Sequence, residues 1–560
     1  MTHLNIIPLL PTLLPVHRVL AMLLALTPAL ASCMHQQAVA ADSEETSAPA
    51  LSEPTMLLAM SRIDDSLDAQ GIADAENGFD DEFAIGPLED QTLWGHIRDG
   101  FVIESGLEHK RTRSELEWYR SHKEYLDRVM TRAEPFLHYI LTEAEKRQLP
   151  TELVLLPIVE SAFQPFAYSH GRAAGLWQFI PSTGRMYGLK QDWWYDGRRD
   201  IHASTQAALN YLEALGKEFK GDWLHALAAY NAGSGNVRRA IRKNKKRNKP
   251  IDYWNLDLPK ETRAYVPKLL ALKEIITNPR EHEVTLHCIP YAPGFIEVDS
   301  GSQIDLALAA ELADIDIETL YMYNPAFNRW STPPEGPHRL ILPAEAASLF
   351  EENLDALPEE ERLSWKRHKI ANGETLSEIA VKYNTTVAHL RKVNKIRGNS
   401  IRAGKHLLIP VASRDRDVYS LTAGQRKQAT QNTSRGQTKQ THVVQSGESF
   451  WEISRAYGVN MHKLAKWNAM AVRDPLREGQ KLVVWSNKAG KSSGQRSAAP
   501  SKGTTMRTIS YTVRNGDSLS RIADRYRVSI ADLQRWNTIK GKYLQPGQKL
   551  KVHIDVRNQS

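Results

Sequence analysis

The sequence predicts a multidomain protein in which a mostly α domain is followed by small α+β modules, each of βααβ order, on flexible linkers. Its 560 residues exceed what one ordinary domain holds, so several units with separate cores are expected. Between Leu93 and about Asn278, apolar and aromatic residues recur at three- and four-residue spacing, which is typical of packed helices. Farther along, a segment that opens on glycine and closes on asparagine recurs three times without a gap, which indicates repeated modules.

The N-terminus has the layout of an export signal. The string "HRVLAMLLALTPALASC" combines a basic pair, an apolar run too short to span a bilayer comfortably, and small residues before Cys33. Its end, "LASC", resembles the lipobox of bacterial lipoproteins, whose cysteine is acylated. The resemblance implies that residues 1–33 form a lipoprotein signal peptide and that lipidated Cys33 anchors the protein to a membrane. An ordinary signal peptide cut after Ala40 is the alternative, because Ala38 and Ala40 fit an A-x-A site.

An exported, lipid-anchored chain is expected in the cell envelope, on the periplasmic side of a membrane. Met34 follows the lipobox at the position where aspartate is the inner-membrane retention signal of enterobacteria, so we expect the outer membrane. Residues 34–93 are rich in Ala, Ser, Asp and Glu and show little periodicity, which predicts a flexible tether.

Charge and spacing give no sign of nucleic acid, metal or cofactor. With 72 basic and 65 acidic residues the net charge is +7, which is modest for this length and compatible with an anionic polymer as partner. The basic run "IRKNKKRNKP" (241–250) lacks interleaved aromatic residues for base stacking, so a solvated loop is its default interpretation. The string "HEVTLHC" (282–288) fits no zinc-ligand spacing.

One carboxylate stands out in the helical region. Glu160 ends the apolar run "TELVLLPIV", and burying an ionised carboxylate without a partner is costly, so its pKa is expected to rise. The stretch that follows, "SAFQPFAYSHGRAAGLWQFIPSTG", turns repeatedly at glycine and proline, which favours a cleft wall over a straight helix. Its hydroxyl, amide and aromatic side chains suit a sugar as ligand.

These strings resemble a known enzyme family. "ESAFQP…S…AAGLWQFIPSTG" is similar to the signature of the lytic transglycosylases, the lysozyme-like bacterial enzymes that cleave peptidoglycan. "AAYNAGSGNV" and "ETRAYVPKLLALK" resemble that family's second and third motifs, in the same order. The resemblance implies a lysozyme-like catalytic domain over residues 94–284. It also implies cleavage of the MurNAc–GlcNAc β-1,4 bond without water, which leaves a 1,6-anhydroMurNAc end.

The resemblance also implies roles for single residues. Glu160 falls on the catalytic glutamate, which acts first as general acid and then as general base. One acid is enough when the substrate's own 6-hydroxyl attacks, whereas typical glycosidases need two. Trp177 departs from the family pattern, where many relatives carry methionine, and it should alter the pocket wall more than the reaction. The implied substrate-binding residues are Ser169, Gln178, Tyr230, Asn231 and Tyr265.

Two other functions stay open at this point. The first is a hydrolytic, lysozyme-type muramidase, for which the string "DWWYDGRRDI" offers Asp192, Asp196 and Asp200 as a second acid. Arg198 and Arg199 beside them favour salt-bridged or helix-capping carboxylates instead. The second is a non-catalytic peptidoglycan-binding scaffold, against which the retained motif residues argue. The motifs do not separate internal cleavage from cleavage at strand ends.

The three repeats resemble LysM modules. "GETLSEIAVKYNTTVAHLRKVN", "GESFWEISRAYGVNMHKLAKWN" and "GDSLSRIADRYRVSIADLQRWN" align throughout, and short extended runs flank each. The resemblance implies weak binding of peptidoglycan glycan strands, with a gain from avidity. The expected boundaries are LysM 1 at 366–411, a linker at 412–440, LysM 2 at 441–485, a linker at 486–507 and LysM 3 at 508–554. The candidate sugar-binding residues are Gly373, Thr375, Asn394, Gly447, Ser449, Asn468, Gly516, Ser518 and Asn537.

A fourth, degenerate copy precedes them within residues 285–350. "LALAAELADIDIETLYMYN" overlays residues 376–394, but Gln303 stands where the other copies have glycine. We expect the fold there and leave glycan binding open. The linkers are polar and rich in Gly and Ser, so we expect them to be flexible. We also expect the protein to be monomeric.

Overall fold

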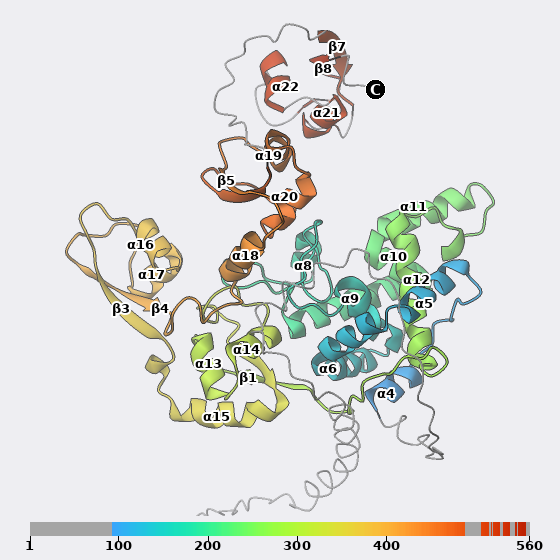
Figure 1. Ribbon diagram of the computed structural model, residues 1–560, viewed down its shortest axis with the longest axis horizontal. Helices are drawn as coiled ribbons and strands as arrows, with labels where there is room; N and C mark the ends of the chain where they lie inside the picture. Colours follow the sequence, from blue (N-terminus) through green and yellow to red (C-terminus); the bar gives the residue numbers. More distant parts are fainter. Residues whose placement is uncertain are drawn as a thin grey trace, which may run out of the picture. The chain divides into compact units, whose positions relative to one another are not determined.

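The computed structural model describes residues 92–487, 506–514, 517, 519–526, 530–537, 544–545 and 547–555. The chain divides into two compact units, one up to Lys488 and one from Ala489. The order of elements along the chain can be followed by colour in Figure 1.

The first domain is helical, as the periodicity predicts, and its helices surround one apolar core. Leu137, Leu209, Leu227 and Leu269, from four different helices, are fully buried in that core. Burial of such side chains is the main stabilising term in a helical domain. The helices are α4 (Leu93–Asp99), α5 (Lys110–Arg120), α6 (Lys123–Lys146), α7 (Leu156–Ser161), α8 (Pro181–Met186), α9 (Ile201–Glu218), α10 (Trp223–Ala232), α11 (Ser234–Lys245) and α12 (Lys260–Thr277), with 3₁₀ turns η2 (Thr151–Leu155) and η3 (Tyr253–Asn255).

The apolar run before Glu160 is buried, as expected. η2 and the first turn of α7 place Leu153 to Ile158 in the core, and Glu160 lies in the last turn of α7. The helix stops because Ala162 and Phe163 adopt left-handed backbone conformations, with φ of 51° and 53°. Such φ values are unusual for residues with a Cβ, so the surrounding packing must hold this turn.

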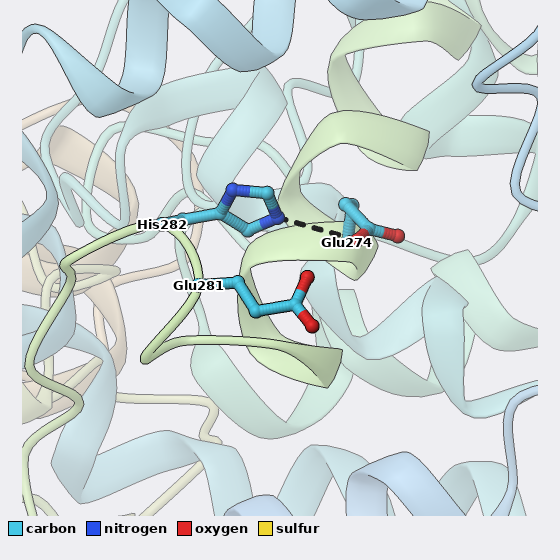
Figure 2. A group of neighbouring side chains, drawn as sticks. All are labelled: Glu274, Glu281 and His282. Carbon is cyan, nitrogen blue, oxygen red and sulfur yellow. Dashed lines mark hydrogen bonds and ion pairs between the residues drawn. The ribbon is translucent and has the colours of Figure 1, made fainter.

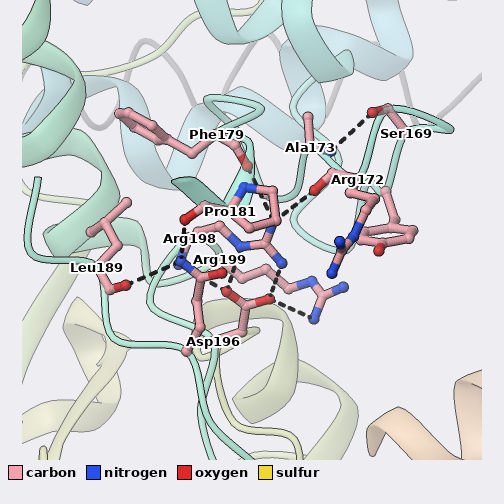
Figure 3. A network of polar contacts seen from close by, with 12 residues as sticks. Ser169, Arg172, Ala173, Phe179, Pro181, Leu189, Asp196, Arg198 and Arg199 are labelled. Atoms are coloured by element: carbon pink, nitrogen blue, oxygen red, sulfur yellow. Dashed lines mark hydrogen bonds and ion pairs between the residues drawn. The ribbon is translucent and has the colours of Figure 1, made fainter. Parts of the chain in front are cut away.

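The segment from Gln164 to Asp200 is largely irregular, as its glycines and prolines predict. Only the short helix α8 interrupts it, and isolated bridges join Ala174 to Tyr168 and to Phe179. Arg198 lies at its centre, as Figure 3 shows, and donates to the carbonyl oxygens of Arg172 (2.7 Å) and Phe179 (3.2 Å). A buried guanidinium therefore ties the two sides of this segment together.

The degenerate copy has the βααβ order that its sequence predicts. Strand β1 (Phe295–Asp299) pairs antiparallel with β2 (Arg339–Pro343) around α13 (Leu306–Leu312) and α14 (Ile317–Tyr323). The 3₁₀ turn η4 (Ala344–Ala346) and helix α15 (Ala347–Ala356) follow, and η5 (Glu359–Glu361) leads out. Trp194 and Tyr195 of the helical domain are buried in the core of this copy, so the two are packed together.

The three LysM repeats also have the predicted βααβ order, each with a two-stranded antiparallel sheet. LysM 1 contains β3 (Ser364–Lys369), α16 (Leu376–Lys382), α17 (Val387–Val393) and β4 (His406–Val411). LysM 2 contains β5 (Lys439–Val443), α19 (Phe450–Tyr457), α20 (Met461–Trp467) and β6 (Lys481–Trp485). LysM 3 contains β7 (Met506–Thr512), α21 (Leu519–Tyr526), α22 (Ile530–Asn537) and β8 (Lys549–Asp555).

The segment 412–440 corrects the expectation of a flexible spacer. It contains helix α18 (Ala423–Asn432), and before that helix Tyr419 is 2% exposed and Leu421 9% exposed. The Tyr419 hydroxyl donates to the carboxylate of Asp305 in the degenerate copy, at 2.9 Å to each oxygen. The buried side chains of Tyr419 and Leu421 thus attach this segment to the degenerate copy, although its polar composition predicts a flexible linker.

Some expectations fall outside the described residues. These are the signal peptide with Cys33, the tether up to residue 91, and most of the linker 486–507. Within the part of the chain that is described, no helix is both long enough and apolar enough to cross a bilayer.

Candidate active site

A cavity of about 450 Å³ opens beside the end of α7. All six residues predicted for catalysis and substrate binding line it, although they come from three motifs that are well separated in the sequence. They are Glu160, Ser169, Gln178, Tyr230, Asn231 and Tyr265. The volume is within the range of small-molecule sites in proteins, so the cavity can hold a sugar ring.

Glu160 is partly buried and has one hydrogen-bond donor, the Tyr265 hydroxyl, 2.6 Å from its Oε1. Its pKa is raised to about 7, first because burial disfavours the charged form. The hydrogen bond from Tyr265 lowers this pKa, and the nearby charge of Glu261 raises it. At neutral pH the carboxyl group therefore exists in both protonation states, which suits a group that must give and then take a proton.

Tyr230 and Trp177 both line the cavity and are joined to each other. The Tyr230 hydroxyl donates to the carbonyl oxygen of Trp177 at 2.9 Å. The Trp177 indole is fully buried and donates to Thr205 Oγ1 at 3.0 Å, so this side chain belongs to the core. The tryptophan that stands here in place of the methionine of many relatives is therefore accommodated in the hydrophobic core of the domain.

Ser169 lies in a tight hairpin at the edge of the cavity. Its backbone N–H donates to the Ala173 carbonyl at 2.9 Å, and its Oγ accepts from the Ala173 N–H at 3.0 Å. A hydroxyl that accepts from the backbone keeps its own proton available to donate. Ser169 can therefore donate a hydrogen bond to a ligand.

Gln178 and Asn231 are also held by neighbouring groups. Gln178 adopts φ of 49°, and its Nε2 donates to the Gly175 carbonyl at 2.8 Å. Asn231 Oδ1 accepts from Thr262 Oγ1 at 2.7 Å, which joins the end of α10 to α12. In both side chains part of the amide is engaged, so the orientation of each is fixed before a ligand binds.

Sequence reasoning missed two charged residues of the cavity, Glu261 and Lys268. Both belong to α12, and with Tyr265 they recur at four- and three-residue spacing on one helix face. The signal was present, because once Tyr265 is placed in the cavity its helical neighbours on that face follow. Glu261 is exposed, and it is the second carboxylate of the cavity.

The aspartates of "DWWYDGRRDI" are structural, as predicted. Asp196 forms a buried ion pair with Arg198 at 2.7 Å, drawn in Figure 3. Asp200 is the N-cap of α9, where it accepts from the Ala203 N–H at 2.6 Å. Asp192 accepts from the backbone of Trp194 at 2.8 Å, and none of the three aspartates lines the cavity.

One group among the described residues has metal-ligating atoms within 4.8 Å of one another: Glu274, Glu281 and His282. Figure 2 shows His282 directed toward the buried Glu274, at 3.2 Å between Nε2 and Oε1. The same Oε1 accepts from Asn278 at 2.8 Å, so the neighbours already satisfy it. The contact between Glu274 and His282 is a structural hydrogen bond at the end of α12.

The opening residues of the LysM repeats shape the backbone. Thr375 and Ser449 are N-caps of α16 and α19 and form capping boxes with Glu378 and Glu452. Gly373 and Gly447 adopt φ of 82°, and a Cβ there would meet open space. Gly516 and Ser518 lie outside the described residues.

The closing asparagines have one geometry in every repeat. In LysM 2, Asn468 Nδ2 donates to the carbonyl oxygens of Leu464 and Val483, and its Oδ1 accepts from the Val483 N–H at 2.7 Å. The same three bonds recur at Asn394, at Asn537 and at Asn324 of the degenerate copy. The amide therefore links the second helix to the second strand of each repeat.

Comparison with protein families gives matches along most of the described chain. The Transglycosylase SLT domain matches residues 138–252 and the LysM domain matches residues 368–410, 442–485 and 511–553. The LysM-like domain of lytic transglycosylase MltD matches residues 294–359, which is the degenerate copy.

Whole proteins are similar as well. Membrane-bound lytic murein transglycosylase D of Escherichia coli strain K12 is 36% identical over 480 residues, which cover 86% of this chain and 89% of that protein. The autolysin of Enterococcus faecalis strain V583 is 32% identical over 33% of this chain and 24% of its own. A solved structure of an inactive mutant of lytic transglycosylase Slt from Pseudomonas aeruginosa is 25% identical over 27% of this chain and 25% of that chain, with a TM-score of 0.21.

Proposed function

Because this chain belongs to the family of membrane-bound lytic murein transglycosylase D, we propose that Glu160 is its single catalytic acid and base. The protein is a peptidoglycan lytic transglycosylase with LysM repeats. The observation that supports the role of Glu160 is its position in the cavity with a pKa of about 7.

The reaction proceeds in two proton transfers. Protonated Glu160 donates its proton to the glycosidic oxygen as the bond from C1 of MurNAc to that oxygen breaks, and GlcNAc leaves with a free hydroxyl. The glutamate, now ionised, takes the proton of the MurNAc 6-hydroxyl while that oxygen bonds to C1. The 1,6-anhydroMurNAc end forms, no water is consumed, and the carboxyl group regains its proton.

The other cavity residues bind and orient the substrate. Tyr265 donates to Glu160 and holds the carboxyl group in one orientation. Hydrogen bonds to the sugar come from the Ser169 hydroxyl, whose proton is available, and from the amides of Gln178 and Asn231. Tyr230 supports the cavity wall through its bond to the Trp177 carbonyl. We also propose that residues 94–284 form the catalytic domain, residues 285–350 the degenerate copy, and residues 366–411, 441–485 and 508–554 the three LysM repeats.

The LysM repeats hold the enzyme on glycan strands through the loop after the first strand and the loop before the second strand, which lie at the same end of each antiparallel sheet. The first loop contains Gly373 and Thr375 in LysM 1 and Gly447 and Ser449 in LysM 2. Gly516 and Ser518 of LysM 3, which lie outside the described residues, are the matching sugar-binding candidates in the sequence. The base of the second loop is fixed by Asn394, Asn468 and Asn537. Several weak sites on one chain gain affinity together when the polymer presents ligands within reach. A monomer is sufficient for this arrangement.

Cys33 carries the lipid that anchors the mature protein to the outer membrane. One acyl chain binds a bilayer only marginally, so stable anchoring needs the several chains of a bacterial lipoprotein. Metabolic labelling with a fatty-acid analogue tests this: wild type should take up the label and Cys33→Ser should not. Equal labelling of both proteins would assign the lipid elsewhere.

The enzymatic proposal is tested by mass spectrometry of muropeptides released from purified sacculi. Wild type should release products lighter by one water than hydrolytic products, and Glu160→Gln should release them slower by about 10²–10⁴-fold while it still binds sacculi. Asp192→Asn is the control, because asparagine keeps the acceptor for the backbone of Trp194, and its rate should equal that of wild type. Products of hydrated mass would indicate hydrolysis, and an active Glu160→Gln would refute the assignment of the acid.

A further inference from the structure

The second LysM repeat contacts the catalytic domain at the hairpin that carries Ser169. Asp474, between α20 and β6, forms an ion pair with Arg172 at 2.7 Å between Oδ1 and Nε. Both of its carboxylate oxygens accept from the Tyr168 hydroxyl, at 3.1 Å each. The rings of His170 and His462 meet edge to face beside them, with centroids 6.1 Å apart.

The loop that presents Asp474 is a particular feature of this repeat. It runs from Asn468 to Gly479, one residue longer than the stretches Asn394 to Gly404 and Asn537 to Gly547 of the other repeats. Asp474 Oδ2 also accepts from the Ala471 N–H at 2.8 Å, and its side chain is only 14% exposed. The carboxylate is therefore fixed within its own loop and largely buried, whereas the Arg172 side chain that it meets is half-exposed.

Helix α18 contacts both the catalytic domain and the start of the loop that carries Asp474. The Arg426 guanidinium stacks on the ring of Phe166, 4.2 Å from the centroid. At the end of α18, Gln431 Nε2 donates to Asn468 Oδ1 at 2.8 Å. Tyr419, bonded to Asp305, anchors the chain just before the helix. The segment that leads into LysM 2 is thus packed against the catalytic domain and the degenerate copy.

The contacted hairpin faces the cavity with its other side. Ser169 and Ala173 line the cavity, whereas Tyr168 and Arg172 extend to Asp474. Arg172 adopts φ of 71°, and its N–H donates to the Ser169 carbonyl at 2.9 Å. A contact that holds the Arg172 side chain therefore holds the turn that sets the position of Ser169.

We propose that Asp474 is a positioning residue for the transglycosylase reaction, through which the second LysM repeat holds the Ser169 hairpin at the cavity. The inference rests on the proposed function, in which Ser169 binds the substrate. Loss of the Asp474 carboxylate leaves Arg172 and the Tyr168 hydroxyl without this partner, and the hairpin then samples other positions. Substrate positioning by such loops is a direct determinant of rate.

The test measures kcat and KM of the full chain on soluble, uncrosslinked glycan strands, together with binding to sacculi. Asp474→Ala should lower kcat/KM about tenfold, which is within the usual range for coupled sites, with little change in sacculus binding. Asp415→Ala removes an exposed acid from the linker segment and should keep the wild-type kcat/KM. Hydrogen exchange of the β6 amides checks that Asp474→Ala keeps the fold of LysM 2.

Exchange of the two charges separates positioning from other roles. Arg172→Asp and Asp474→Arg should each lower kcat/KM, and the double variant should recover part of the loss because the pair is restored in reverse. If Asp474→Ala has the kcat/KM of wild type, the inference is refuted. It is also refuted if Asp474→Ala loses sacculus binding by the same factor as kcat/KM and the double variant recovers neither. In either case an inactive Glu160→Gln would leave the proposed function standing.

Discussion

The Tyr265 hydroxyl donates a hydrogen bond of 2.6 Å to Oε1 of Glu160, a residue 105 positions earlier in the chain. The bond joins the third motif, on α12, to the first, on α7. It stabilises the ionised form of a carboxyl group whose burial favours the neutral form. The proton affinity of Glu160 is thus set by two opposing effects, which can be altered separately.

Tyr265→Phe removes the donor and should raise the pKa of Glu160 above its value of about 7. The reaction starts from protonated Glu160, so the rate falls as pH rises through this pKa. A higher pKa moves that alkaline fall to higher pH. The pH profile of kcat/KM on soluble glycan strands measures the shift. A fall at the wild-type pH would show that the bond has no influence on the acid.

Glu261→Gln should act in the opposite direction. The negative charge of Glu261 raises the pKa of Glu160, so its removal lowers that pKa and moves the alkaline fall to lower pH. Because Glu261 is exposed, the shift should shrink at high salt. Glu261→Asp, which keeps the charge, is the control. A complete loss of activity would instead assign Glu261 a proton-transfer step and revive the hydrolytic alternative.

The sequence predicts the cavity well because its residues lie in three strings long enough to be compared with a family. Burial before Glu160 follows from apolar composition alone, whereas the cavity position of Tyr265 does not, since an isolated tyrosine on a helix is more often a core residue. Glu261 was missed although its helical spacing from Tyr265 was visible. Contacts between distant segments, such as Glu160 with Tyr265, are fixed by tertiary packing that no local pattern encodes.

The LysM repeats and the segment 412–440 show a different limit. The capping-box pattern at Thr375 and Ser449, with glutamate three residues later, was readable from the sequence and explains both residues structurally. Tyr419 is one aromatic residue in a polar stretch, and the buried carboxylate that it binds, Asp305, lies more than one hundred positions earlier in the sequence. The polar composition of residues 412–440 therefore predicted a flexible spacer, although two buried side chains, Tyr419 and Leu421, attach this segment to the degenerate copy.

Asn468→Ala distinguishes a structural asparagine from a sugar ligand. It leaves the buried N–H and carbonyl of Val483 without their partner, which should cost about 1–3 kcal/mol. Hydrogen exchange of the β6 amides should accelerate accordingly. Lys463→Ala, at an exposed position of the preceding helix α20, should leave that exchange near the wild-type rate. Unchanged exchange in Asn468→Ala together with weaker sacculus binding would instead assign the side chain to the ligand.

Tyr419→Phe tests the attachment of the segment 412–440 to the degenerate copy. Asp305 is fully buried, and burial raises its pKa above the usual value of 3.8, while the Tyr419 hydroxyl lowers it. A carboxyl group with a raised folded-state pKa favours folding below its unfolded pKa, and this contribution is lost as pH rises through the folded pKa. Without the hydroxyl the pKa of Asp305 rises further, so the variant should lose stability at neutral pH and little at acid pH.

The loss should be about 1–3 kcal/mol for one hydrogen bond to a buried charge. Limited proteolysis of the segment 412–440, followed as a function of pH, measures it: cleavage of Tyr419→Phe should exceed that of wild type at neutral pH and approach it in acid. Arg414→Gln removes an exposed ion pair with Glu311 and should change cleavage little. The contacts of Leu421 and helix α18 remain in Tyr419→Phe. Equal cleavage of wild type and Tyr419→Phe at every pH would therefore show that these contacts hold the segment without the Tyr419–Asp305 bond.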